Sequence, residues 1–245
     1  MWVVAEYLPV TLFSFRSGIA TSSGAKTLFL PTPFAIRTAL VDAAIRTYGL
    51  NAGRRAFEWI KELSIAVCPP ERVVVTNLFA KVLKPTRKED PETPMDRSIA
   101  FREYAQLGGT LALAFRVSEP HKDELISLVL QVNYFGKRGS FFQLRGQPYT
   151  VEDLPAEFIP LDGVSVQGTQ VQGQLPKAFV AGLVQIMDDW GKSLTFDKLN
   201  IFSEEKIRLD TDRIRKSVIL PYRLVRSSKS FSYYERISPD NPASV

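Results

Sequence analysis

The sequence has very few of the residues that bind metals or form disulfides. Cys68 is the only cysteine and His121 the only histidine among 245 residues. A disulfide needs two cysteines, and a structural zinc site needs several cysteine or histidine ligands. The chain alone therefore cannot build a disulfide framework or such a zinc site. We expect no metal, no cofactor and a reducing, cytoplasmic setting.

Long apolar runs are also missing. No segment approaches the roughly 20 apolar residues that a helix needs to cross a bilayer. Residues 2–5 are apolar, but no basic region precedes them as it would in an export signal. We therefore expect neither export nor a membrane span.

Acidic residues are outnumbered by basic ones. The chain has 31 Lys and Arg against 26 Asp and Glu, a formal net charge of +5 and a pI near 9.3. This balance modestly favours a polyanionic partner. With 245 residues, of which 45% are hydrophobic, the chain can bury a sizeable core, and we expect one domain with insertions.

The first 145 residues alternate between strand and helix patterns. Aromatic, β-branched or alternating apolar residues predict strands at residues 2–15, 72–83, 98–104, 110–117 and 141–145. Capping residues and apolar periodicity predict helices at residues 34–48, where Thr32-Pro33 supply the start, at residues 54–66, and between Pro120 and Gly136. The order is typical of an α+β, ferredoxin-like fold, which nucleic-acid binding modules of the RRM type share.

The remaining segments are less regular. Residues 84–97 hold three prolines and mixed charges, which predicts a projecting loop or flap. Residues 155–203 are ambiguous and give no assignment. Residues 217–225 and 230–237 predict two strands joined by a short turn at residues 226–229, and Pro221 indicates a sheet edge.

The first candidate site is a long stretch without acidic residues. Between residues 7 and 41 there is none, while basic and hydroxyl side chains occur at Arg16, Ser17, Ser22, Ser23, Lys26 and Arg37. Free amides of a Ser/Gly loop and of a helix N-terminus can bind phosphate groups. An ordinary solvated loop that happens to lack acids explains the pattern equally well.

Two further basic segments carry aromatic neighbours. Lys137 and Arg138 form a turn before Phe141-Phe142, which fits single-strand binding but equally a helix C-terminus followed by core residues. Residues 213–229 hold six cations and no acid, among them Arg226 and Lys229, and aromatic residues follow. The alternative for this segment is a charged edge strand that resists aggregation.

Catalytic interpretations have weaker support. Tyr48, His121 and Lys122 could form a metal-independent RNA-cleaving set, with the histidine as acid or base and the lysine stabilising charge. A histidine directly after Pro120 is, however, most often an incidental residue in the first turn of a helix. Asp188-Asp189 could hold a metal ion, but adjacent carboxylates rarely converge on one ion, so we expect a surface turn there.

Three segments carry a family resemblance. Residues 15–18 (FRSG), 22–26 (SSGAK) and 30–40 (LPTPFAIRTAL) resemble the RAMP superfamily of CRISPR proteins. More closely, the chain is similar to the fifth Cas family, the Cascade subunit that caps the five-prime handle of the CRISPR RNA. Residues 134–138 (YFGKR) are similar to that family's step from helix to turn. The resemblance spans roughly residues 1–145, with weaker support from the C-terminal hairpin.

The resemblance implies an architecture and a function. It implies an RRM-like core at residues 1–150, whose flap at residues 84–97 matches a thumb-like insertion that contacts the guide and a neighbouring subunit. Residues 151–245 would then be an insertion and a β-hairpin region packed on the core. The chain would be an RNA-binding subunit of a type I surveillance complex in antiviral defence. Its partners would be the guide RNA, other backbone and large subunits and, indirectly, target DNA, with no membrane.

The resemblance also bears on the site residues and on catalysis. The residues expected to bind RNA are Arg16, Ser17, Ser22, Ser23, Lys26, Arg37, Lys137, Arg138, Arg226 and Lys229. One branch of the family cleaves precursor RNA with a tyrosine, a lysine and a histidine, in which the lysine precedes the histidine. Here His121 precedes Lys122. We therefore expect a non-catalytic cap, with an endoribonuclease as the alternative.

Overall fold

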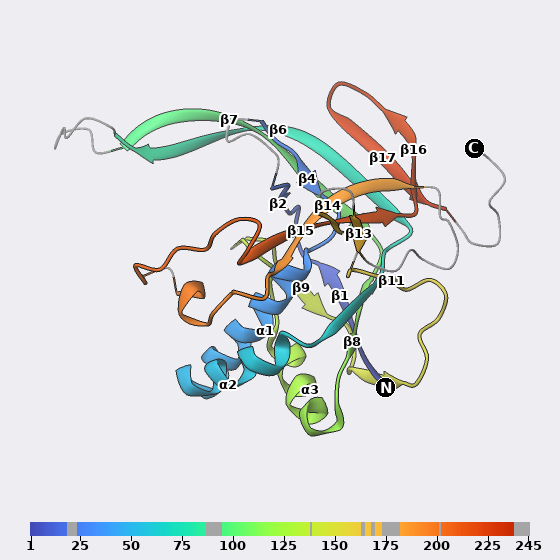
Figure 1. The fold of residues 1–245 in the computed structure, drawn as a ribbon. Coiled ribbons are helices and arrows are strands. Elements are labelled where there is room, and N and C mark those ends of the chain that lie inside the picture. The colour runs from blue at the N-terminus through green and yellow to red at the C-terminus, as the bar shows by residue number, and fades with distance from the viewer. Residues whose placement is uncertain are drawn as a thin grey trace.

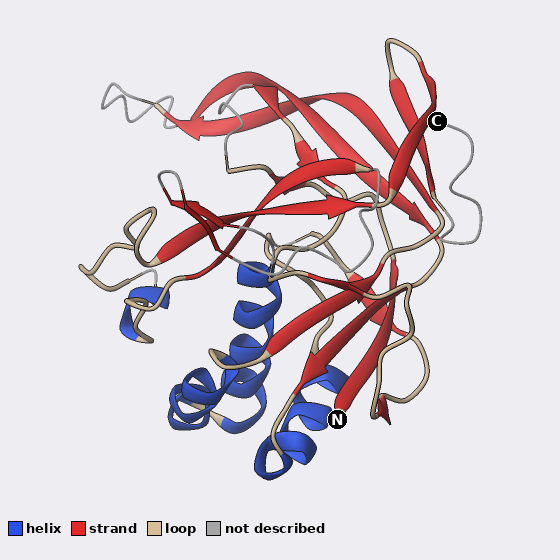
Figure 2. Cartoon of the chain, turned by 45° about the vertical axis from the view of Figure 1, so that its right-hand side comes forward, coloured by secondary structure: helices blue, strands red, loops and turns tan. Residues whose placement is uncertain are grey.

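Three α-helices and several mainly antiparallel sheets make up the described part of the chain, shown by the computed structural model in Figures 1 and 2. The structure describes residues 1–18, 24–86, 95–137, 139–162, 165–167, 170–172, 182–200 and 202–237. No helix within these ranges is both long enough and apolar enough to cross a membrane.

A six-stranded antiparallel sheet forms the centre of the fold. Its order is β10-β1-β8-β5-β11, and β9 also pairs with β1. The strands are β1 (Trp2–Pro9), β5 (Ser64–Cys68), β8 (Leu111–Arg116), β9 (Phe142–Leu144), β10 (Tyr149–Val151) and β11 (Ile159–Pro160). Successive residues of β8 alternate between the two sides of this sheet, as the sequence pattern predicts.

The helices lie together on one side of this sheet (Figure 2). They are α1 (Pro33–Tyr48), α2 (Leu50–Ile60) and α3 (Lys122–Gln131), and a 3₁₀ turn, η1 (Glu119–His121), precedes α3. The Thr32 hydroxyl accepts the amide hydrogen of Ala35, so α1 begins where its cap predicts. The chain order β1, α1–α2, β5, β8, α3, β9 and the sheet order together confirm the ferredoxin-like core.

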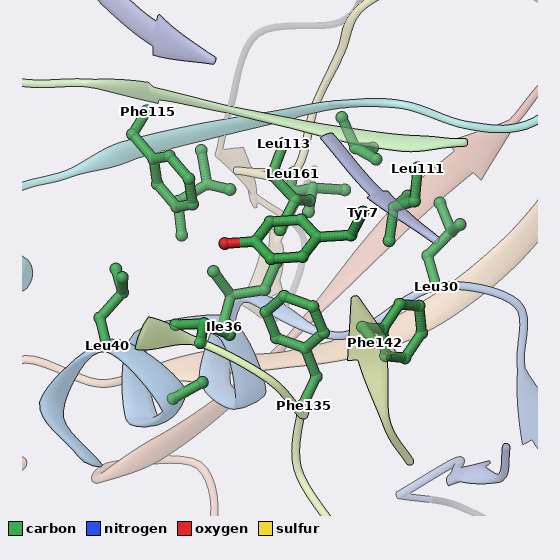
Figure 3. Close-up of a cluster of buried hydrophobic side chains, with 14 of the residues drawn as sticks. Tyr7, Leu30, Ile36, Leu40, Leu111, Leu113, Phe115, Phe135, Phe142 and Leu161 are labelled. Atoms are coloured by element: carbon green, nitrogen blue, oxygen red, sulfur yellow. The ribbon is translucent and has the colours of Figure 1, made fainter. Parts of the chain in front are cut away.

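The main core fills the space between this sheet and the helices (Figure 3). Tyr7 of β1 is fully buried, and its hydroxyl donates to the backbone oxygen of Val129 at 2.9 Å. Burial raises the pKa of the Tyr7 phenol well above its ordinary value. The ring of Phe135 meets Tyr7 edge-on at 5.3 Å, and the ring of Phe142 lies 5.2 Å from Phe135. This contact fixes the segment after α3 against β1.

The chain segment between β5 and β8 forms the two long strands of a second sheet. Its order is β16-β17-β6-β7-β3. The strands are β3 (Gly24–Ala25), β6 (Arg72–Pro85), β7 (Met95–Gly108), β16 (Tyr222–Ser227) and β17 (Phe231–Arg236). The distal halves of β6 and β7 project from the body as an arm (Figure 1).

Shorter pairs complete the structure. β14 (Leu183–Trp190) and β15 (Arg213–Leu220) form an antiparallel ribbon that packs against α1. The other elements are β2 (Phe15–Arg16), β4 (Thr27–Leu28), β12 (Ser165–Gln167), β13 (Gln170–Gln172) and the 3₁₀ turn η2 (Asp197–Leu199). Residues from both halves of the chain, including Met187 and Tyr222, join the same buried cluster. The division of the chain near residue 150 stays a prediction.

The predicted helix at residues 54–66 is wrong at its C-terminal end. α2 stops at Ile60, and Ser64–Cys68 is instead a central strand of the core sheet. Pro69-Pro70 therefore ends a strand and not a helix. The predicted strands at residues 72–83 and 98–104 exist, but they belong to the second sheet and not to the core. The expected first strand at residues 2–15 breaks after Pro9.

The projecting segment and the C-terminal strands begin and end at other residues than the sequence predicts. The expected flap at residues 84–97 begins and ends inside β6 and β7, and residues 87–94 lie outside the described residues. Pro221 separates β15 from β16, which lie in different sheets, where the sequence predicts one strand at residues 217–225. The strand predicted at residues 230–237 is confirmed as β17.

The close contact between α1 and α2 generates a stability prediction. A Cβ atom at Gly53 would lie 2.2 Å from Cγ1 of Ile45, so an alanine there forces the helices apart. Gly53→Ala should lower the free energy of unfolding by about 1–3 kcal/mol in urea denaturation, since overpacking a core costs that much. Asn51→Ala, on the exposed side of α2, is the control. A stabilised Gly53→Ala protein, as expected for an open helix, would contradict the packing.

Candidate nucleic-acid interface

The acid-free segment forms a short two-stranded ribbon. Arg16 of β2 pairs with Thr27 of β4, and the Ser17 amide donates to the Lys26 backbone oxygen at 3.0 Å. The ribbon thereby brings Arg16 and Lys26, which are ten residues apart, to neighbouring positions. The next turn leads into the N-terminus of α1.

The second predicted basic segment lies against this ribbon. Gly136 has a φ of 65°, and a Cβ atom there would lie 3.5 Å from Cβ of Ala35 and 3.9 Å from the ring of Phe15. The turn that carries the exposed Lys137 therefore touches both β2 and the first turn of α1. The structure thus brings together two basic segments that are separated by more than a hundred residues in sequence.

We call this region the handle surface and define it as Arg16, Lys26, Lys137 and the first turn of α1. Ser17, which the sequence also predicted to bind RNA, is only 7% exposed and its amide is bonded within the ribbon, so that prediction is wrong. No acidic residue lies in that first turn, so the partial positive charge of the helix N-terminus is not offset within the helix. Two acids lie nearby: the Glu103 carboxylate of β7 accepts from Nζ of Lys26 at 2.5 Å, and the Asp188 carboxylate lies beside Gly18 but is buried and paired with Arg213. The Lys26 side chain is nevertheless 75% exposed, so it stays accessible to an anion.

The other expected RNA-binding residues have different outcomes. Ser22, Ser23 and Arg138 lie outside the described residues. Arg226 and Lys229 are exposed on the hairpin of β16 and β17. That hairpin is at the edge of the second sheet opposite to β3, so these two residues do not join the handle surface.

The expectation that Arg37 contacts RNA is corrected by the structure. Arg37 is only 4% exposed. Its Nε donates to Asp189 at 3.0 Å, and its terminal nitrogens donate to the backbone oxygens of Ile60, Lys61 and Leu63. The guanidinium is therefore engaged inside the protein, where it holds α1, the end of α2 and β14 together.

The expected surface turn at Asp188-Asp189 is also wrong. Both residues lie in β14 and are buried. Asp189 accepts from Lys216 Nζ at 2.9 Å as well as from Arg37, and Asp188 forms an ion pair with Arg213. The Arg213 guanidinium also lies 4.6 Å above the ring of Phe34, in the first turn of α1. The paired aspartates thus anchor the start of α1 from beneath the handle surface.

The residues of the alternative catalytic set have other neighbours. His121 stacks on Trp59 with ring centroids 5.0 Å apart and planes 9° apart, and its Nδ1 lies 3.8 Å from Glu124. Lys122 lies 3.6 Å from Glu119, and Tyr48 is exposed at the end of α1. Within the described ranges, no group of three or more His, Cys, Asp or Glu residues is arranged to hold a metal ion.

Several residues that shape this region have no signal in the sequence. Trp59, Glu103 and Arg213 act on residues far away along the chain, and nothing in their immediate sequence indicates these partners. The Pro-rich start of α1, in contrast, was visible because its cap is local.

Comparison with known proteins gives one relative by sequence. No family model matches the chain. Over 104 residues the chain is 32% identical to the CRISPR-associated protein Cas5 of Archaeoglobus fulgidus. The aligned region covers 42% of this chain and 46% of that protein. The chain thus matches about half the length of this curated relative.

Two solved structures are similar in outline. A chain of a CRISPR RNA-guided surveillance complex has a TM-score of 0.43 and 15% identity, with 88% of this chain and 89% of that chain covered. A CRISPR protein from Archaeoglobus fulgidus has a TM-score of 0.39 and 11% identity, with 97% and 92% covered.

The buried Arg37 network generates a second stability prediction. Arg37→Met removes one of the two cations that pair with Asp189 and the donor to three backbone oxygens, while Lys216 still pairs with Asp189. Breaking a buried ion pair typically costs about 3–5 kcal/mol. We expect a loss of that order in the free energy of unfolding, measured by thermal or urea denaturation.

Arg46→Met is a matched control on the same helix. Arg46 pairs with Asp42 at 2.7 Å on the exposed side of α1, where such pairs contribute about 0.5 kcal/mol or less. Equal stability losses for the two variants would contradict a structural role for Arg37.

Proposed function

We propose that the chain is a RAMP-type CRISPR protein like the Cas5 relative with which it shares 32% identity over 104 residues, and that it holds the five-prime handle of a guide RNA. It would do so as a subunit of a type I CRISPR surveillance complex. The sequence relationship supports the family, and the handle surface supports the task. The ferredoxin-like core is compatible with both, since RRM-type modules use the same arrangement.

The convergence of the two basic segments is the observation that carries the proposal. The ribbon with Arg16 and Lys26 and the turn with Lys137 meet at the N-terminus of α1. An RNA backbone that crosses this surface would meet exposed cations close to the positive end of the α1 dipole. The buried Arg37 and Arg213 contacts fix the first half of α1, so the helix end is held in place before RNA binds, which reduces the entropy lost on binding.

The arm supports membership in an assembly. It exposes apolar residues on both strands, including Phe79 at 77% and Ile99 at 70% exposure. Phe79 and Phe101 pack edge to face at 4.9 Å, which stiffens the strand pair. We propose that the arm docks on a neighbouring backbone subunit and on the guide. Large subunits and, through the guide, target DNA would be further partners.

We propose that the subunit does not cleave the RNA. The stack on Trp59 and the nearby Glu124 give His121 a structural environment. Lys122 points its charge toward Glu119 and is thereby partly neutralised. Another protein would then process the precursor RNA.

The handle surface generates a binding prediction. We expect labelled CRISPR-repeat RNA to bind the purified chain in a salt-dependent manner. The triple variant Arg16→Gln, Lys26→Gln, Lys137→Gln should bind more weakly. Its log–log salt slope should be shallower by about 2, because each phosphate contact on a single strand contributes roughly 0.7.

A charge-matched control separates this surface from net charge. The variant Arg55→Gln, Lys192→Gln, Lys206→Gln removes three exposed cations on other parts of the structure. It should retain nearly the affinity and slope of the wild type. Equal losses in both triple variants would count against the handle surface.

A cleavage assay distinguishes the two hypotheses for His121. Incubation of the chain with repeat RNA should leave the RNA intact, and His121→Ala should change neither this result nor the affinity. Products that form with wild type and disappear with His121→Ala would establish the endoribonuclease instead.

A further inference from the structure

The second sheet has one buried and one open side. Val73, Val75, Ala105, Leu107 and Tyr234 are buried or face the core. Because side chains alternate along a strand, the residues between them project from the opposite side. This outer side belongs to β6, β7, β16 and β17.

Three aromatic residues share the outer side. Phe231 of β17 is in register with Thr76 of β6, which is in register with Tyr104 of β7. Tyr233 lies two residues beyond Phe231 on the same strand, roughly 7 Å away, and Tyr104 is two strands away, roughly 10 Å. All three are partly exposed. They form a set of rings spread over one side of the sheet and not a closed cluster.

Arginines surround these rings. Arg226 is in register with Tyr233, and Arg72 is in register with Glu235 on the same outer side. Arg102 precedes Tyr104 by two positions, and its Nε is buried without a hydrogen-bond partner among the described residues. Lys229 adds an exposed cation at the tip of the hairpin.

The acid on this side is already engaged. Glu235 accepts from the Tyr233 hydroxyl at 2.8 Å and lies 3.7 Å from Arg223. The hydrogen bond to Glu235 raises the pKa of the Tyr233 phenol, so the ring stays neutral at physiological pH. The surface therefore combines neutral aromatic rings with a surplus of arginine charge.

We propose that this outer side, the platform (Arg72, Arg102, Tyr104, Arg226, Phe231 and Tyr233), binds single-stranded nucleic acid. Unpaired bases would stack on the rings, and phosphates would contact the arginines, which is how sequence-tolerant single-strand binders work. Paired bases cannot stack on a flat sheet in this way, so a duplex does not fit.

A protein partner could instead add a strand to the free edge of the second sheet, which is β16, but two features of β16 disfavour this. The register of β16 shifts between Leu224 and Arg226, and Pro221 before the strand has no amide hydrogen to donate. Both features interrupt the regular ladder that an added strand would need.

The platform is separate from the handle surface. Arg102 of the platform is in register with Ala25, the residue before Lys26, so the two surfaces adjoin at β3. Lys26, however, pairs with Glu103, which projects from the side of β7 opposite to Arg102 and Tyr104, so the two surfaces lie on opposite sides of the second sheet. A strand on the platform would therefore be additional to the handle. The inference goes beyond the proposed function and does not require it.

The test is equilibrium binding of fluorescent homopolymers, of uridine or of deoxythymidine, about eight nucleotides long, to the full chain. Tyr104→Ala, Phe231→Ala and Tyr233→Ala should each weaken binding at least about fivefold, from the measured range of stacking energies. Tyr233→Phe keeps the ring and should bind within about twofold of wild type by the same reasoning. Tyr149→Ala removes an exposed aromatic of the core sheet and is the matched control.

Two readouts keep a folding defect apart from a binding defect. Circular dichroism and the melting temperature identify a variant that fails to fold. Among folded variants, weaker binding by Tyr233→Ala than by Tyr233→Phe shows that the ring itself contacts the oligonucleotide. Photo-cross-linking of the bound oligonucleotide should label the peptide that contains Phe231 and Tyr233. Preference for the RNA or the DNA homopolymer identifies which strand the platform takes.

The outcomes also separate this inference from the handle. The Arg16, Lys26 and Lys137 triple variant should retain homopolymer binding, even if repeat RNA turns out not to be favoured over other sequences. Absence of homopolymer binding by wild type, or unchanged binding by all three alanine variants, would overturn the platform. Cross-links confined to the handle surface would overturn it as well.

Discussion

Arg37 is the residue on which the arrangement of the candidate interface depends, because its buried guanidinium joins three separate parts of the chain. It binds Asp189 on β14 and backbone oxygens at the end of α2, while its own backbone belongs to α1. A guanidinium cannot stay buried without such partners, so these elements can pack in few other ways. The neighbouring Asp188–Arg213 pair extends the same constraint to the first turn of α1.

The long strand pair β6–β7, inserted in the chain between β5 and β8, determines which surfaces the protein exposes. The core sheet buries one side against the helices, whereas the second sheet keeps an outer side open and extends into the arm. The chain thereby offers surfaces with different chemistry. The handle surface presents cations near a helix N-terminus, the platform presents rings and arginines, and the arm presents exposed apolar residues. The proposed role, in which one subunit contacts RNA and protein at the same time, would need such a division.

Local signals in the sequence were sufficient for much of the fold. Thr32-Pro33 marks the start of α1 because the cap is made within four residues, and alternation identifies β8. Ser64–Cys68 was missed because a short apolar run does not distinguish a strand from the end of a helix. Arg37, Asp188 and Asp189 were misread because their charges are paired at a distance: Asp189 is 152 residues from Arg37, and Asp188 is 25 residues from Arg213. No local pattern reports such pairing.

The most direct test of the account is to purify the tagged chain from cells that carry its CRISPR array and partner genes, and to sequence the RNA that remains bound. The account predicts RNAs that share one repeat-derived five-prime end, cross-linked to the chain through the segments around Arg16 and Lys137. Bound RNA with unrelated five-prime ends, or handle cross-links that map only to other subunits, would contradict it.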